Sequence, residues 1–303
     1  MQVCDVLVIG GGVAGLTAVL QAAKLGWRCV AFTGFEPPGG LLAGVESIQD
    51  IPDYPSGIAG YDLGPIMQEA AMDAGVVFLS ERACLISRDT DGWVVHGEKT
   101  VVETRVVVLA MGMRLRSLNI PGETEFAGRG VSHCASCDAP LLRGHVAAVI
   151  GGGDAACQEA LTIAKSATEV HLLVRGKSLR ARRDWQLRVA QQTNIRLHLH
   201  TSVIAIRGDS AGVNAIEVQD GRRLEVRGVF AYAGLEPCTD IVRELVSFDQ
   251  HGRILVDQDM QTSQSGLMAA GSLRSGSNGQ ASQGIEDGRR VALTLDRVLR
   301  NND

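Results

Sequence analysis

The sequence predicts an α/β protein with two doubly wound nucleotide-binding domains, because a strand, a glycine turn and a helix follow one another twice. The first copy begins with the short apolar run Val6–Ile9, typical of a buried parallel strand, which leads directly into GGGVAG (10–15). The second copy begins with Val146–Ile150 and leads into GGGDAA (151–156), about 140 residues later. Two complete copies indicate two separate domains, each with its own nucleotide site.

The elements around each glycine turn come in the same order. After the first turn, helical periodicity runs from Leu16 to Leu25, Gly26 ends the helix, and Arg28–Phe32 has the composition of the next strand. After the second turn come the helical stretch CQEALTIAKSA (157–167) and the strand EVHLLV (169–174). In such Rossmann-like units the glycines let the backbone approach a pyrophosphate, which lies at the helix N-terminus.

Length, charge and composition exclude several classes of protein. The 303 residues are enough for two domains, and a content of 45% hydrophobic and 21% charged residues is that of a globular protein without membrane-spanning segments. The net charge of -5 and the dispersed basic residues argue against a nucleic-acid surface. The N-terminus lacks the basic leader and long apolar run of a secretory signal, so we expect a cytoplasmic protein.

Two of the seven cysteines, Cys134 and Cys137, lie in the stretch CASCD (134–138) and predict a redox centre. A zinc site needs four ligands, and the chain has no second C-x-x-C and no histidines at a recognised spacing, so no metal site is expected. Two intervening residues let the sulfurs close a small ring, in a disulfide that can cycle. Asp138 follows the second thiol, where it can move the proton that thiol-disulfide exchange requires.

The segment after the strand 169–174 favours NADPH over NADH. An acid at this strand end would bind the 2'-hydroxyl of the ribose, whereas arginine accommodates a 2'-phosphate. The sequence here is VRGKSLRARR (174–183), which contains several cations and no acid. NADPH is therefore the predicted nicotinamide cofactor.

These motifs together resemble the low-molecular-weight thioredoxin reductases and the related reductase portion of the alkyl hydroperoxide reductase flavoprotein. The most specific stretch is GRGVSHCASCD (128–138), which is followed after a short segment by the second glycine turn. Further matches to the family pattern occur in the same order along the chain, at Thr33-Gly34, Gly39-Gly40, MAAGS (268–272) and Gly279-Gln280-Ala281. The likeness covers essentially the whole chain.

The resemblance implies both the domain arrangement and the reaction. Residues 1–117 and 241–303 would form a discontinuous FAD domain, and residues 118–240 an NADPH domain that carries the cysteine pair and is inserted through two crossovers. Electrons would pass from NADPH through FAD and the Cys134–Cys137 dithiol to a protein disulfide. By this resemblance Cys137 faces the flavin and Cys134 attacks the external disulfide.

The residues that match the cofactor-binding positions of the family form two sets. The set for FAD is Gly10, Gly12, Val13, Ala14, Gly15, Thr33, Gly34, Gly40, Leu41, Gly112, Gly271, Ser272, Gln280 and Ala281. The set for NADPH is Gly151, Gly153, Asp154, Ala155, Ala156, Arg175 and Arg180.

Five positions depart from the family pattern. Ser272 stands where the family has the acid of A-A-G-D, so its hydrogen bond to the ribityl chain of the flavin would lack charge assistance. Leu41 replaces the glutamine of G-G-Q-L, and Met111 replaces the threonine of A-T-G. Gly279 and Gly176 replace arginines at the flavin and phosphate sites. Most flavin and pyrophosphate contacts in the family come from the backbone, which the glycine pattern retains.

Three functions are compatible with these features. The favoured one is an NADPH-dependent, thioredoxin reductase-like homodimer that reduces a thioredoxin-like protein or another disulfide, without nucleic acid or membrane partners. The second is a dithiol oxidase that uses oxygen, or a reductase that receives electrons from ferredoxin, because Gly176 and Leu41 weaken the cofactor patterns. The third is a non-catalytic redox-sensing subunit, suggested by Ser272 and Gly279.

Overall fold

The computed structural model describes residues 2–90 and 92–301, without the side chain of Ser136. The chain divides into two compact units, unit 1 (Met1–Arg114 and Glu236–Asp303) and unit 2 (Leu115–Leu235). It passes between the units at two strands that pair with each other, β7 (Met113–Leu115) and β16 (Leu235–Pro237). The family resemblance implies crossovers near residues 117 and 240, whereas the units of the structure change after Arg114 and after Leu235.

Unit 1 is built on a seven-stranded sheet with the order β3-β2-β1-β6-β5-β4, and β17 pairs with the last residues of β6. The strands are β1 (Gln2–Ile9), β2 (Cys29–Phe32), β3 (Val77–Leu79), β4 (Ala83–Arg88), β5 (Trp93–Gly97), β6 (Val101–Leu109) and β17 (Leu267–Ala269). All neighbours are parallel except the pairs β6-β5 and β5-β4. The predicted strands Val6–Ile9 and Arg28–Phe32 therefore lie side by side at the centre of the sheet.

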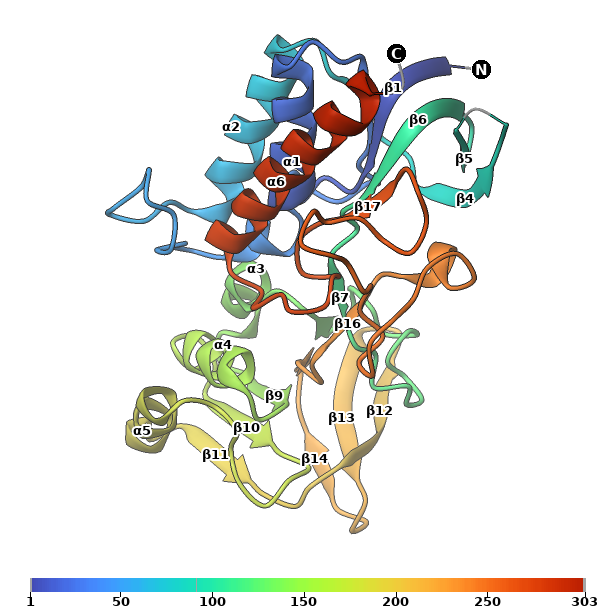
Figure 1. The fold of residues 1–303 in the computed structure, drawn as a ribbon. Coiled ribbons are helices and arrows are strands. Elements are labelled where there is room, and N and C mark those ends of the chain that lie inside the picture. The colour runs from blue at the N-terminus through green and yellow to red at the C-terminus, as the bar shows by residue number, and fades with distance from the viewer. Residues whose placement is uncertain (1, 91, 302–303) are drawn as a thin grey trace. The chain divides into compact units, whose positions relative to one another are not determined.

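Three helices of unit 1, α1 (Val13–Lys24), α2 (Gly60–Asp73) and α6 (Ala281–Arg300), pack together beside this sheet (Figure 1). Val19 of α1 and Leu295 of α6 belong to one buried cluster with the alternate sheet residues Val8 and Val108. The opposite face of the sheet packs against the segment 241–256, which contains the end of the short helix η3 (Asp240–Val242). Both faces of the central strands are thus buried, as the continuous apolar runs predict.

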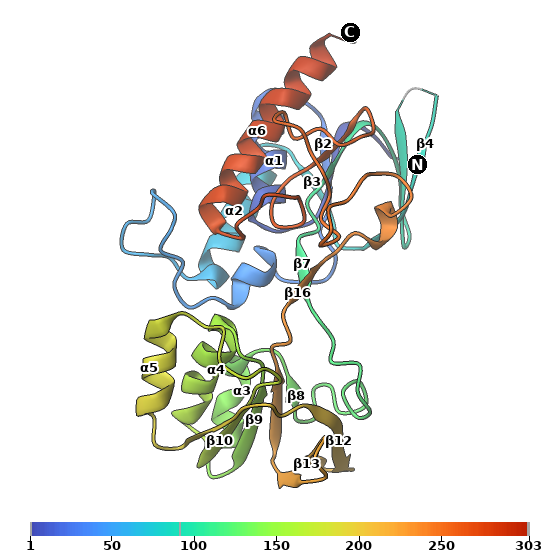
Figure 2. The ribbon, with the colours of Figure 1, turned by 60° about the horizontal axis from the view of Figure 1, so that its bottom comes forward.

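Unit 2 contains a five-stranded parallel sheet with the order β11-β10-β9-β15-β8 and a three-stranded antiparallel sheet, β12-β13-β14. The strands are β8 (Val131–Ser132), β9 (Val146–Ile150), β10 (Glu169–Leu173), β11 (Ile195–His198), β12 (Val203–Asp209), β13 (Gly212–Val218), β14 (Arg223–Glu225) and β15 (Gly228–Ala231). The helices are α3 (Ala135–Asp138), η2 (Ala139–Leu142), α4 (Asp154–Ala164) and α5 (Arg183–Gln191). Figure 2 shows these helices on one side of the parallel sheet and β12–β13 on the other.

Each unit has the strand, glycine turn and helix in the predicted order, so the predicted fold class is confirmed. The second helix begins at Asp154 and ends at Ala164, three residues earlier at each end than the stretch 157–167. It begins earlier because the glycine turn itself supplies its N-cap, Gly153. Among the residues described, no helix combines the length and the apolar content needed to cross a membrane.

Two histidines on neighbouring strands of unit 2 contact each other. His171 Nδ1 on β10 lies 3.0 Å from His198 Nε2 on β11, and Glu169 Oε1 lies 3.6 Å from His171 Nε2. Burial and then the charge of His198 lower the pKa of His171, and burial and then Arg222 lower the pKa of His198. Arg196 adds to both decreases, whereas Glu169 opposes them.

We expect the protein to lose thermal stability as the pH falls below the ordinary histidine range. Because both folded-state pKa values are lowered, the unfolded chain binds more protons than the folded chain below about pH 6.5. The stability that the neutral pair contributes is therefore complete above about pH 6.5 and decreases as the pH falls towards the lowered values. When the pH is lowered from about 8 to about 5, the thermal unfolding midpoint of His198→Gln should fall by less than that of the wild type. An equal fall in both proteins would contradict this expectation.

Candidate functional site

The glycine turn of unit 1 joins the end of β1 to the start of α1. Gly10 has φ +121°, and a β-carbon there would overlap the carbonyl oxygen of Ala110. A β-carbon on Gly15 would overlap the carbonyl oxygen of Gly10. These two glycines are therefore required by the fold itself, because β1, α1 and the end of β6 approach too closely for a side chain.

Gly12, the N-cap of α1, has a different environment. A β-carbon at Gly12 would meet no atom of the protein within 4 Å, and its φ of -77° is one that any residue adopts. The first turn of α1 has no capping side chain and no acid. No side chain caps the N–H groups of this turn, and the side of Gly12 that would carry a β-carbon is open, as an anion bound at a helix N-terminus would require.

Gly40 and Gly271 of the predicted FAD set, and Gly39 next to the first of them, lie against this turn. Gly39 N–H donates to the carbonyl of Gly11 at 2.9 Å, and a β-carbon on Gly40 would lie 3.5 Å from Gly12 Cα. A β-carbon on Gly271 would lie only 2.8 Å from Ala14 Cβ. Residues from three distant parts of the sequence therefore meet at the first turn of α1.

The remaining positions lie nearby in unit 1. Gly112, with φ +66°, approaches the Ser272 hydroxyl, since a β-carbon there would lie 3.6 Å from Ser272 Oγ. Ala281 is buried in one cluster with Val13, and Gln280 is the N-cap of α6. Leu41 stands apart, with a side chain that is 50% exposed on η1 (Gly40–Gly44).

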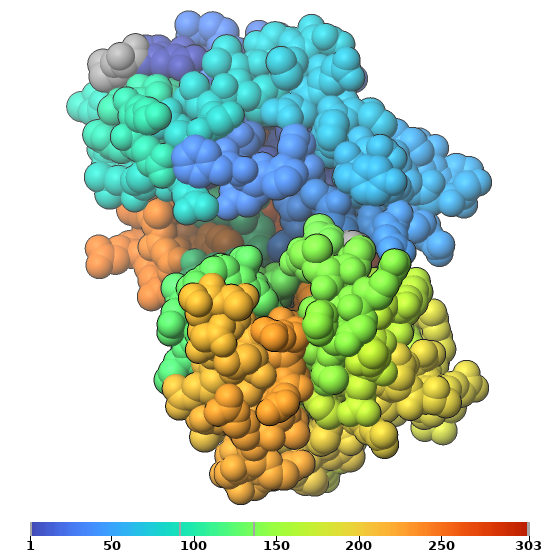
Figure 3. Space-filling model, turned by 180° about the vertical axis from the view of Figure 1, so that it is seen from behind, coloured from blue at the N-terminus to red at the C-terminus, as the bar shows by residue number. Residues whose placement is uncertain are grey.

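A pocket beside the same turn is lined by Gly11, Thr33, Gly34 and Glu36, among others. Figure 3 shows the segment that contains these last three residues, in mid blue, at the surface of unit 1. Burial raises the pKa of Glu36, but hydrogen bonds from the backbone and from Arg82 outweigh it, so that the pKa lies below its ordinary value. Glu36 is consequently ionised at neutral pH and accepts hydrogen bonds.

The glycine turn of unit 2 repeats these features between β9 and α4. Gly151 has φ +149°, and a β-carbon there would lie 2.5 Å from the carbonyl oxygen of Tyr232 and 3.0 Å from Ala156 Cβ. Gly153, the N-cap of α4, would place a β-carbon in open space, as Gly12 does in unit 1. The N-terminus of α4 is therefore open at Gly153 in the same way.

Asp154 and the segment after β10 are tied together. Arg182 N–H donates to Asp154 Oδ1 and Arg182 Nε to Asp154 Oδ2, both at 2.7 Å. Arg180 and Ala181 donate backbone N–H groups to the carbonyl of Gly152, at 2.7 and 3.1 Å. The carboxylate in the first turn of α4 is thus neutralised by a cation, and the segment is anchored to the glycine turn.

The other members of the NADPH set lie in the segment after β10 and in the first turn of α4. Arg175 and Arg180 are exposed in the segment between β10 and α5, and Lys177 is exposed between them. Ala155 is exposed on the first turn of α4, whereas Ala156 is buried against the turn. These exposed cations, close in sequence to the anchored turn, suit a 2'-phosphate.

Cys134 and Cys137 form a disulfide in unit 2, with their Cα atoms 5.3 Å apart. They flank the start of α3, where Cys137 N–H donates to Cys134 Sγ at 3.3 Å. The Cys134 N–H donates to Ser132 Oγ at 3.0 Å, and the Asp138 N–H donates to the Cys134 carbonyl at 3.1 Å. Cys137 is exposed and Cys134 and Asp138 are partly exposed, so the pair is accessible on this unit.

Tyr232 connects the disulfide segment to the nucleotide turn of the same unit. Its hydroxyl donates to the carbonyl of His133 at 3.2 Å, and its own carbonyl lies against Gly151. Burial, and then the neighbouring Glu159, raises the pKa of Tyr232 above its ordinary value, so the hydroxyl keeps its proton and its donor role. His133 is held from a second direction, since its Nδ1 lies 3.2 Å from the carbonyl of Ala231.

The five other cysteines are free thiols, and three of them, Cys4, Cys29 and Cys157, are buried. Burial is the main cause that raises the pKa of Cys4 and Cys157 to about 11 and that of Cys29 to about 12, so these thiols are unreactive at neutral pH. In the described ranges no three histidine, cysteine or acidic side chains gather as metal ligands. Of the other two free thiols, Cys84 is exposed and Cys238 is partly buried.

The sequence profile of the family described as pyridine nucleotide-disulphide oxidoreductase matches residues 4–288. The chain belongs to this family. It is 34% identical over 311 residues to the NADPH-dependent thioredoxin reductase 3 of Arabidopsis thaliana, covering 99% of this chain and 59% of the plant protein. It is 31% identical to the thioredoxin reductase of Treponema pallidum, covering 95% and 94%. A crystal structure of Lactococcus lactis thioredoxin reductase superimposes with a TM-score of 0.89 at 29% identity, covering 98% and 99%.

These findings confirm the predicted family, and the chain is a thioredoxin reductase-like disulfide oxidoreductase. Membership of the family implies FAD and NADPH as cofactors, in agreement with the prediction. Gly12 and Gly153 hold equivalent places in the two units, each as the N-cap of the helix that follows a glycine turn.

Glu36 and Tyr232 are absent from the residue sets that the sequence motifs predict. Glu36 had a local signal, because an acid shortly after the second strand of a nucleotide-binding unit is the usual ribose ligand. Tyr232 had none, since it lies about 80 residues after Gly151 in the chain and meets it only through the pairing of β15 with β9.

Proposed function

We propose that the chain is an NADPH-dependent flavoprotein that reduces protein disulfides through Cys134 and Cys137. The observation that carries the proposal is the accessible Cys134–Cys137 disulfide at the start of α3, in a chain with two open nucleotide turns. The FAD set of residues would hold FAD in unit 1, with Glu36 on a ribose hydroxyl, and the NADPH set would hold NADPH in unit 2. FAD, when bound, relays two electrons from the nicotinamide to the disulfide.

The cysteines and Asp138 carry the remaining chemistry. In the dithiol form the Cys134 thiolate attacks one sulfur of the substrate disulfide, which breaks that bond and gives a mixed disulfide. The Cys137 thiolate then attacks Cys134 Sγ, which restores the Cys134–Cys137 bond and releases the substrate as a dithiol. The N–H of Cys137 stabilises the Cys134 thiolate, and Asp138 gives and takes the protons.

We further propose a thioredoxin-like protein as the substrate, a homodimer as the working form and the cytoplasm as the location. The names of the plant and Treponema relatives support the substrate. The proposals of the dimer and of the location rest on the family resemblance. Light scattering on the purified protein measures the dimer directly.

An anaerobic visible spectrum, titrated with NADPH and separately with NADH, tests the proposed function. We expect a yellow protein whose flavin band is bleached by NADPH at a lower concentration than by NADH, because the segment after β10 is cationic. A flavin that neither nucleotide reduces would favour a dithiol oxidase or a ferredoxin-fed reductase. A colourless protein without reductase activity would favour the redox-sensing subunit.

A further inference from the structure

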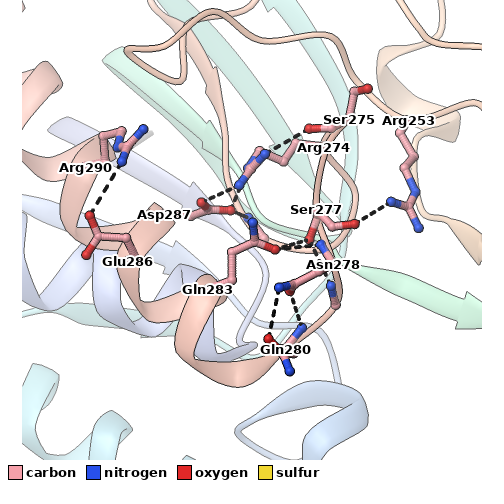
Figure 4. Close-up of polar contacts among 12 residues, drawn as sticks. Arg253, Arg274, Ser275, Ser277, Asn278, Gln280, Gln283, Glu286, Asp287 and Arg290 are labelled. Carbon is pink, nitrogen blue, oxygen red and sulfur yellow. Dashed lines mark hydrogen bonds and ion pairs between the residues drawn. The ribbon is translucent and has the colours of Figure 1, made fainter. Parts of the chain in front are cut away.

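A buried ion pair joins Arg274 to Asp287 of α6 (Figure 4). Arg274 Nε and Nη2 donate to Asp287 Oδ2 and Oδ1, at 2.6 and 2.7 Å. Asp287 is 2% exposed and Arg274 is 9% exposed. Asp287 Oδ2 also accepts the N–H of Gly271 at 2.9 Å. A single carboxylate on α6 thus binds both the turn at Gly271 and the arginine that follows it.

The other bonds of Arg274 stay within the same segment. Its Nη1 donates to the carbonyl of Ser275 at 2.9 Å, and its backbone N–H donates to the carbonyl of Gly271 at 3.2 Å. Two buried charges are costly to desolvate, and they are tolerated only when their hydrogen bonds are met. Here the bonds that meet them fix the path of the backbone from Gly271 to Ser275.

Helix α6 is itself held against the first turn of α1. A β-carbon on Gly288, the residue after Asp287, would lie 2.6 Å from the carbonyl oxygen of Ala14. Gly271, with φ +82°, approaches the side chain of the same Ala14. Asp287 therefore joins two elements that both contact the first turn of α1, where the open space beside Gly12 lies.

We infer that Asp287 and Arg274 are positioning residues for FAD, which hold the Gly271–Ser272 turn against the first turn of α1. The inference rests on the proposed FAD site in unit 1. Arg274 has a second effect, since it neutralises a buried carboxylate close to a site for an anionic pyrophosphate. With Ser272 in place of the family's acid, the turn has no charge of its own and depends on this pair for its shape.

The dissociation constant of FAD, measured by flavin fluorescence on the full chain, tests this role. We expect Asp287→Asn to raise it about tenfold or more, because the turn loses a charged acceptor. Arg274→Met should raise it further, because a buried carboxylate is then left unpaired beside the anion site. Arg274→Lys keeps the positive charge but cannot form the two parallel hydrogen bonds to the carboxylate. Its dissociation constant of FAD should lie between those of the wild type and Arg274→Met.

Asp296→Asn is the matched control, with the same substitution on the same helix. Asp296 Oδ1 accepts the Trp27 Nε1–H at 2.9 Å, so the variant removes the charge from this acceptor and weakens a tether of α6 that lies away from Gly271. It should lower the unfolding midpoint without changing the dissociation constant of FAD by more than about twofold. If Asp296→Asn weakens FAD as much as Asp287→Asn does, the pair has only a structural role and the inference fails.

The outcomes separate this inference from the proposed function. A wild-type protein that binds no FAD would overturn both. A wild-type protein that binds FAD, together with Asp287→Asn or Arg274→Lys variants that bind it within about twofold of the wild type, would overturn the positioning role alone. Arg274→Lys keeps a cation beside Asp287, so it serves where the Asp287→Asn protein does not fold.

Discussion

Cys137→Ser is expected to lower the rate of disulfide reduction by at least about 10⁴-fold. Without Cys137 Sγ, the reduced flavin cannot pass electrons to the cysteine pair and the mixed disulfide with the substrate cannot be resolved. Cys134→Ser should have an effect of the same size, since Cys134 Sγ attacks the substrate disulfide and then receives the attack of Cys137. Bleaching of the flavin by NADPH should persist in both variants, as neither residue belongs to a cofactor set. The measurement is NADPH oxidation with a thioredoxin disulfide, beside the anaerobic flavin spectrum.

Cys84→Ser is the control for these variants. Cys84 is a free, exposed thiol of unit 1, so its replacement tests whether an accessible thiol as such affects the assay. Its rate should equal that of the wild type. A Cys137→Ser protein that kept a tenth or more of the wild-type rate would exclude the pair as the redox centre.

Gly12→Val is expected to give a folded but colourless protein, with a dissociation constant of FAD raised about a hundredfold or more. The valine side chain would occupy the open space at the N-terminus of α1, where the pyrophosphate is proposed to bind. The fold should tolerate it, because the φ and ψ of Gly12, -77° and 173°, lie in the extended region and a β-carbon meets no protein atom. Absorbance at the flavin band and the unfolding midpoint of the apoprotein measure the two effects.

Gly153→Val makes the same change at the equivalent position of unit 2 and serves as the reciprocal control. Its protein should be yellow, and NADPH should fail to bleach it, since the open space at α4 is filled instead. Flavin loss in Gly153→Val, or retention of flavin in Gly12→Val, would show that the two turns do not serve the cofactors assigned to them.

The fold was predictable because its signals are local. Each nucleotide-binding unit can be recognised within about 30 residues, from an apolar strand, a glycine turn and an amphipathic helix. Gly10 and Gly151 carry particular weight, since their positive φ values and close backbone neighbours leave glycine as the residue that fits. The family resemblance then supplied the discontinuity of unit 1, which no local pattern reveals.

The parts of the site that escaped prediction depend on side-chain contacts between distant segments. Asp154 was assigned to NADPH from its place in the glycine motif, and the structure shows it bonded to Arg182. The pair Arg274–Asp287 joins a turn to a helix, and Tyr232 joins two motifs across strand pairing. Which partner a charged or polar side chain selects is decided by tertiary packing, so the sequence alone gave no indication of these three contacts.

The division of unit 1 into two stretches has a consequence for the order in which the protein can form during synthesis. Unit 2 has all its residues once Leu235 has been added. Unit 1 still lacks β17, which pairs with β6, and α6, which supplies Val291 and Leu295 to its core. The part of unit 1 that ends at Arg114 therefore keeps some of its apolar surface exposed until α6 has been synthesised and has left the ribosome.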